Sequence, residues 1–107
     1  MTRAWVLLIV AGLLEIAWAI GLKYTDGFRK PVPSALTIVT LTASFWLLAQ
    51  ALKTLPIGTG YAVWTGIGAV GTAILGIVLF DEPRNAGRVL SIVLIVAGII
   101  GLRITAR

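Results

Sequence analysis

The chain has 107 residues, of which 59% are hydrophobic and only 12% are charged, and its net charge is +5. A soluble domain is usually about 45–50% apolar, so this composition excludes most soluble globular classes and indicates a membrane protein. The sequence contains no cysteine and no histidine. Disulfides are therefore excluded, and zinc sites and histidine-based acid–base chemistry are not expected.

Four apolar stretches predict membrane-spanning helices at about 4–22, 32–52, 56–80 and 87–104. A hydrocarbon core about 30 Å thick requires roughly 20 helical residues, which each stretch provides. The first stretch is not followed by a signal-peptide cleavage site, so we expect it to be retained as a helix. The connections are too short for an extramembrane domain. We therefore expect one all-α membrane domain over residues 1–107, built as a four-helix bundle.

The first stretch contains a carboxylate, Glu15, in the middle of an otherwise uncharged run. The other three acidic residues, Asp26, Asp81 and Glu82, lie at the ends of apolar stretches, where water is available. A carboxylate at bilayer depth is costly, and such residues usually mark ion paths or proton relays. We therefore hypothesise that Glu15 binds a proton or a cation, one at a time.

Two residues are candidates for positioning this carboxylate. Trp18 follows Glu15 at i+3 and therefore shares its helix face. Ser44 supplies a hydroxyl in the middle of the second stretch and is able to hydrogen-bond a carboxylate. The alternative is that Ser44 bonds the carbonyl four residues earlier in its own helix.

The third stretch places Tyr61 and Trp64 at i and i+3, where they would line an aqueous cavity beside Glu15 and attract cations through their ring faces. A headgroup anchor is the alternative for Tyr61, which lies near the start of the stretch. Six of the chain's twelve glycines fall in this stretch. They favour close helix packing and bending, and we predict a hinge at Gly66 and Gly68 that switches access to the site.

The fourth stretch carries one stripe of small and apolar residues, formed by Ser91, Leu94, Gly98 and Gly101. Such a stripe is typical of a helix–helix contact, and we predict that it is a dimer seam. Packing within the chain is the alternative.

The positive charges lie at the ends of the apolar stretches, which indicates anchoring to headgroups rather than nucleic-acid binding. One side of the membrane would carry four Lys and Arg residues and the other side five. Orientation normally follows an imbalance of these charges, so the near-tie predicts that the chain inserts both ways. Two oppositely oriented copies would form an inverted pair. The alternative is that context fixes one orientation. The four positive residues expected on one side are Arg3, Lys53, Arg103 and Arg107. The five expected on the other side are Lys23, Arg29, Lys30, Arg84 and Arg88.

Two long motifs resemble the small multidrug resistance family. The first is GLLEIAWAIGLKY at 12–24, followed by Gly27 and Phe28, and the second is LPIGTGYAVWTGIGAVGT at 55–72. Both look like the guanidinium-exporter branch, and the resemblance covers essentially the full chain. The quaternary-ammonium branch usually lacks the tryptophan that Trp18 supplies. Gly60 departs from the alanine expected before the tyrosine.

The resemblance implies an antiparallel homodimer in the bacterial inner membrane that exchanges protons for guanidinium. The family's central glutamate corresponds to Glu15 and its first-helix tryptophan to Trp18. Its second-helix serine corresponds to Ser44, and its third-helix tyrosine and tryptophan to Tyr61 and Trp64.

Two other functions remain open at this point. One is the proton-coupled export of bulky quaternary ammonium or aromatic cations. The other is a non-transporting membrane subunit that packs against a different partner. An enzyme is not expected, because the sequence supplies no nucleophile–base pair, phosphate loop or metal cluster. We likewise expect no cofactor and no bound metal.

Overall fold

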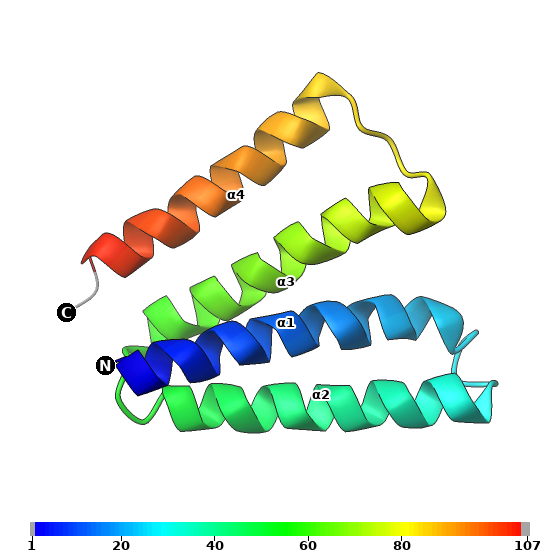
Figure 1. Ribbon diagram of the computed structural model, residues 1–107, viewed down its shortest axis with the longest axis horizontal. Coiled ribbons are helices and arrows are strands. Elements are labelled where there is room, and N and C mark those ends of the chain that lie inside the picture. Colours follow the sequence, from blue (N-terminus) through cyan, green and yellow to red (C-terminus); the bar gives the residue numbers. More distant parts are fainter. Residues whose placement is uncertain (1, 106–107) are drawn as a thin grey trace.

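The computed structural model describes residues 2–105 and contains four α-helices joined by short loops (Figure 1). They are α1 (Thr2–Tyr24), α2 (Pro31–Ala51), α3 (Ile57–Phe80) and α4 (Ala86–Thr105). Each helix begins and ends within about two residues of its predicted span. Each is long and apolar enough to cross a membrane. The predicted all-α membrane architecture with four spanning helices is therefore confirmed.

Local sequence explains where the helices start and stop. Pro31 occupies the first turn of α2, where its missing amide hydrogen costs nothing. Asp81 adopts a left-handed conformation (φ 53°) and ends α3. After α1, the Thr25 hydroxyl donates to the Leu22 carbonyl at 2.7 Å and accepts the Phe28 amide at 3.2 Å. These contacts fix the turn that leads into α2.

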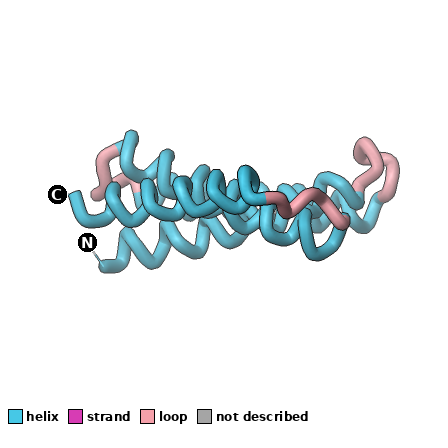
Figure 2. The backbone as a smooth tube through the Cα atoms, turned by 90° about the horizontal axis from the view of Figure 1, so that it is seen from above, coloured by secondary structure: helices cyan, strands magenta, loops and turns pink. Residues whose placement is uncertain are grey.

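Helix α1 is the centre of the fold, because it packs along both α2 and α3, whereas α4 packs along α3 only. Figure 1 shows α4 at the outer edge, splayed away from α1 and α2. The molecule is flat, with extents of 43 × 35 × 17 Å, and Figure 2 shows this thin layer edge-on. A layer this thin does not enclose a channel by itself.

The glycines of α3 admit side chains from α1. The Glu15 side chain lies against Gly68, and the Ile16 side chain lies against Gly71, so a methyl group at either glycine would collide with it. The prediction that these glycines permit close helix packing is thus confirmed at both positions. The buried core lies near the start of α1, where Trp5 and Leu8 pack with Val63 and Trp64.

The two ends of the molecule carry the charges that the sequence assigned to them. The start of α1, the α2–α3 loop and the end of α4 lie at one end, and the other two loops lie at the opposite end (Figure 1). Arg107, which the charge count included, lies outside the described residues. All three acidic residues other than Glu15 lie at the end that holds the α1–α2 and α3–α4 loops.

Candidate functional site

The Glu15 carboxylate lies half-buried between α1 and α3. It is the only acidic side chain within the spanning part of the described helices. A methyl group at position 68 would lie 2.7 Å from the Cγ atom of Glu15 and closer still to its carboxylate. The Oε1 atom is buried and has no hydrogen-bond partner within residues 2–105. This oxygen is therefore available to a proton or to a cationic ligand.

Ser44 is fully buried and connects three helices. Its hydroxyl donates to the Ala11 carbonyl of α1 at 2.7 Å and accepts the indole N–H of Trp64 at 3.0 Å. Both partners proposed from the sequence, the Glu15 carboxylate and the carbonyl four residues earlier, are therefore wrong for this structure. The physical reason is that α1 passes close enough to offer a carbonyl in the buried position.

The Ala11 carbonyl is also the helical acceptor for the Glu15 backbone amide, one turn later. Ser44 thus fixes the backbone that carries the carboxylate and does not touch the carboxylate itself. Because Ser44 and the Trp64 indole satisfy each other, neither leaves a buried polar group unpaired. The network holds α1, α2 and α3 in register beside Glu15.

Four aromatic rings form a continuous row across α1, α2 and α3. The centroids of Trp18 and Phe45 are 6.3 Å apart, those of Phe45 and Trp64 are 5.3 Å apart, and those of Tyr61 and Trp64 are 5.6 Å apart. The structure therefore brings together the three aromatic residues that the sequence predicted. Sequence reasoning missed Phe45, which links Trp18 to Trp64. Its only signal was its place beside Ser44.

The rings of this aromatic row differ in exposure. Trp64 is only 4% exposed, whereas Tyr61 is 56% exposed. The Trp18 indole nitrogen is buried and has no partner in the described part of the chain. It is thus a hydrogen-bond donor available to a ligand. The exposure of Tyr61 is compatible both with a headgroup anchor and with a cavity wall.

The two glycines of the predicted hinge have different surroundings. Gly68 contacts the Glu15 carboxylate, whereas a methyl group at Gly66 would meet the Ile99 side chain of α4 at 3.0 Å. Helix α3 is continuous from Ile57 to Phe80 across both positions. The hinge itself stays a prediction, but Gly68 also has a second role because it makes room for Glu15.

The predicted seam on α4 faces away from the rest of the chain. Ser91, Leu94 and Gly98 are exposed, and a methyl group placed at Gly98 or Gly101 would have no atom of another described element within 4 Å. Helix α4 instead contacts α3 through Ile95 and Ile99. The alternative that the stripe packs within the chain is therefore wrong for these residues. Their use as a dimer seam stays a prediction.

Residues 2–105 contain no group of three or more acidic, cysteine or histidine side chains that would hold a metal ion. The chemical features of the site are thus one half-buried carboxylate, an indole donor and a row of rings. Such a set suits a planar organic cation, which would pair with the carboxylate and lie against the aromatic faces.

Comparisons with known proteins show the family of this chain. Residues 3–95 match the family model described as Small Multidrug Resistance protein. A guanidinium exporter of Yersinia pestis is 61% identical over 103 residues, which cover 96% of this chain and 99% of the relative. A guanidinium exporter of Salmonella typhimurium is 57% identical over 103 residues (96% and 98% coverage). One from Escherichia coli K12 is 57% identical over 102 residues (95% and 97%). The chain is therefore a multi-pass membrane protein and belongs to the small multidrug resistance family.

Proposed function

We propose that this protein exports guanidinium and small guanidinyl compounds in exchange for protons, and that both ligands compete for Glu15. The observation that carries the proposal is the position of Glu15, a half-buried carboxylate within the spanning helices whose Oε1 atom lacks a partner in the described chain. Relatives that are 57–61% identical are named guanidinium exporters, which supports the choice of substrate.

The chemistry of the two ligands explains how the flows are coupled. Guanidinium is planar and presents its N–H donors as a fork that matches a carboxylate. A protonated carboxyl group no longer offers this negative charge, so Glu15 binds either a proton or guanidinium. If the site faces one side of the membrane at a time, guanidinium leaves only when protons enter. Competition at one residue is then sufficient for antiport.

The aromatic row provides the walls of the site. Trp18 lies on α1, the helix that carries Glu15, Trp64 lies on α3, and Phe45 bridges them. Ring faces attract a cation by about 0.5–2 kcal/mol, which is enough to hold guanidinium without retaining it. Tyr61 continues the wall toward the exposed end of α3 and acts as a gate.

The working unit in this proposal is an antiparallel homodimer in the bacterial inner membrane. The flat chain does not enclose a channel alone, and α4 has no buried residue within its described range. A second, inverted copy would cover the exposed stripe at Ser91, Leu94, Gly98 and Gly101. The four-against-five distribution of Lys and Arg supports insertion in both orientations.

A glycine substitution tests the dimer seam without disturbing the chain itself. Gly98→Val adds side-chain atoms where the described chain has nothing within 4 Å, so a loss of dimer would report on a partner. Gly58→Val is the matched control, because Gly58 is a helical glycine with equally open surroundings. We expect only Gly98→Val to shift the protein from dimer to monomer in detergent. Dimers of unchanged stability in both variants would contradict the seam.

Purified protein in liposomes tests the transport function. On solid-supported membranes, we expect guanidinium to evoke a current and tetrapropylammonium to evoke none. Current with the bulky cation alone would favour the multidrug branch of the family. Absence of current with both cations would favour a non-transporting subunit that requires a different partner. A tag-accessibility assay that finds one fixed orientation would contradict dual insertion.

A further inference from the structure

A cavity that is open to the surface lies between the Glu15 site and one end of the molecule. Its volume is about 340 Å³, and residues of α1, α3, the α3–α4 loop and the start of α4 line it. Its inner lining residues, Ala19 on α1 and Ala69 and Thr72 on α3, lie within about one helical turn of Glu15 and its contact Gly68, and its outer residues lie at the charged loop end. Glu15 is not among its lining residues. The cavity therefore lies beside the Glu15 site, on the side that leads to the loop end of the molecule.

A carboxylate is built into the outer part of this cavity. The left-handed residue Asp81 turns the chain at the end of α3, and the Glu82 amide bonds the Gly76 carbonyl at 3.2 Å. The Glu82 side chain consequently folds back over α3. A methyl group at Gly76 would lie 2.8 Å from the Cδ atom of Glu82, so a larger residue there would displace the carboxylate.

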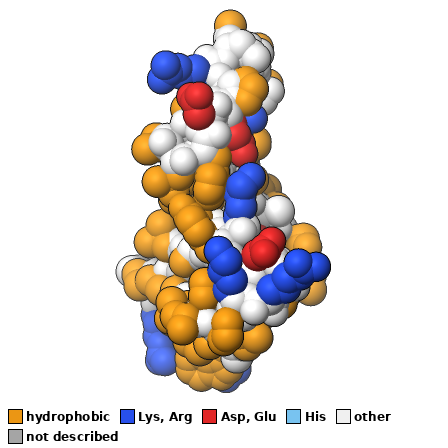
Figure 3. All heavy atoms as spheres, turned by 90° about the vertical axis from the view of Figure 1, so that its right-hand side faces the viewer, with side chains coloured by type: hydrophobic (Ala, Val, Ile, Leu, Met, Phe, Trp, Pro, Cys, Tyr) orange, Lys and Arg blue, Asp and Glu red, His pale blue; other side chains and the backbone are white. Residues whose placement is uncertain are grey.

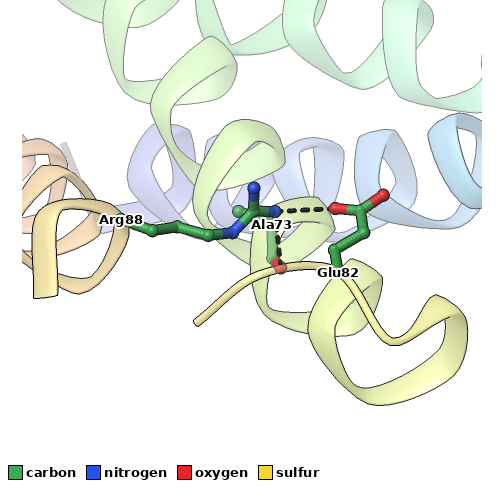
Figure 4. Close-up of polar contacts among 3 residues, drawn as sticks. All are labelled: Ala73, Glu82 and Arg88. Carbon is green, nitrogen blue, oxygen red and sulfur yellow. Dashed lines mark hydrogen bonds and ion pairs between the residues drawn. The ribbon is translucent and has the colours of Figure 1, made fainter. Parts of the chain in front are cut away.

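The ligand of this carboxylate is a guanidinium group that belongs to the chain itself. The Nη2 atom of Arg88 on α4 lies 2.7 Å from Oε1 of Glu82 and 3.5 Å from the Ala73 carbonyl, as Figure 4 shows. The second oxygen, Oε2, accepts no hydrogen bond within residues 2–105. The Glu82 side chain is 40% exposed. It thus holds a guanidinium group by one oxygen and leaves the other open.

Three further features of this cavity determine how strongly it would bind a cation. The Thr72 hydroxyl is buried at the inner end without a partner in the described chain, and it offers an acceptor between Glu82 and Glu15. The Lys23 ammonium lies 4.8 Å from the centroid of the Phe80 ring at the rim. Figure 3 looks onto this end and shows acidic and basic side chains interspersed there. With Lys23 and Arg88 nearby, Glu82 would bind a second cation weakly, as transit requires.

We propose that Glu82 is a transit site for guanidinium, where the transported cation exchanges with the guanidinium group of Arg88 between Glu15 and water. This inference rests on the guanidinium exchange proposed above and assigns it a second binding site. In an inverted dimer, each face of the membrane would receive one such site. No covalent bond is formed or broken, because one charge-assisted hydrogen bond to Glu82 replaces another.

The half-saturating guanidinium concentration, measured from the currents that increasing guanidinium concentrations evoke in liposomes, tests this site. Glu82→Gln removes the carboxylate, and we expect it to raise the half-saturating concentration about two- to fivefold, the range for an exposed ion pair. Arg88→Gln removes the competitor but keeps the carboxylate, so we expect it to lower that concentration by a similar factor. Asp81→Asn is the matched control, because it neutralises the adjacent acid, which does not line the cavity, and it should match the wild type.

Gly76→Ala is a second way to test the site if Glu82→Gln folds poorly. It keeps every charge and displaces the Glu82 carboxylate, so we expect the same rise as for Glu82→Gln. Equal losses in Glu82→Gln and Arg88→Gln would overturn the proposal, because the pair would then only hold α4 against α3. Wild-type behaviour of Glu82→Gln would overturn it as well. Both outcomes leave the antiport intact, whereas absence of guanidinium current in the wild type overturns the antiport together with this site.

Discussion

Replacing Gly68 by alanine separates the positioning of Glu15 from the flexibility of α3. The added methyl group would lie 2.7 Å from Cγ of Glu15, whereas packed carbon atoms stay about 3.5–4.0 Å apart. The Glu15 side chain must therefore move by about 1 Å. Leaving its rotamer costs about 0.5–1.5 kcal/mol. Alanine stabilises a helix over glycine by about 0.5–1 kcal/mol, so folding should be retained.

We expect Gly68→Ala to reduce the affinity for guanidinium more than it reduces the stability of the fold. If the displaced carboxylate loses one charged hydrogen bond to guanidinium, about 1.5–3 kcal/mol is lost, which is about 10- to 100-fold in affinity. Gly66→Ala is the control, because its methyl group meets the Ile99 side chain at 3.0 Å and Ile95 at 3.5 Å, and the Ile99 side chain is able to shift. We expect its affinity to stay within about twofold of the wild type.

Equilibrium titration with guanidinium and current amplitude in liposomes would be measured for both variants. Wild-type affinity in Gly68→Ala would refute the positioning argument. Equal reductions of maximal current in both variants, with affinity unchanged, would instead support the hinge.

Three further predictions concern the same site. Ser44→Ala leaves the buried Trp64 indole unpaired and should destabilise the protein by about 1–3 kcal/mol in thermal unfolding. Combining it with Trp64→Phe should cost less than the sum of the single changes; strict additivity would contradict the hydrogen-bond network. Glu15→Gln should abolish proton-coupled exchange, and Glu15→Asp should retain exchange with a shifted pH dependence; coupled transport by Glu15→Gln would refute the mechanism. Because guanidinium displaces protons, its half-saturating concentration should fall as pH rises, by about tenfold per pH unit for each proton displaced. A concentration that is constant with pH would exclude competition.

The sequence predicted the elements of this fold well because the bilayer imposes strong constraints on them. A spanning helix requires about 20 apolar residues, and the chain separates its four runs with charged residues, prolines and short turns. The spans, the two charged ends and the isolation of Glu15 follow from this pattern alone. The i, i+3 spacing also placed Tyr61 and Trp64 together correctly, since helix geometry determines which residues share a face.

The partners of buried polar groups were not predictable in the same way. Ser44 had several chemically acceptable partners, and the one it uses, the Ala11 carbonyl, lies 33 residues away in the chain. Phe45 joined the aromatic row only because α2 packs beside α1 and α3. Such contacts depend on how the helices rotate and cross, which hydropathy does not specify.

Hydropathy and charge alone are sufficient to predict a four-helix membrane protein with one carboxylate at depth, because the cost of polar groups in lipid leaves few alternatives. The tertiary structure decided which surfaces meet. It placed Gly68 against Glu15, joined Ser44 to Trp64, left the α4 stripe open and folded Glu82 back onto Arg88. These contacts depend on close packing between helices, where the presence or absence of one methyl group selects the side chain that fits.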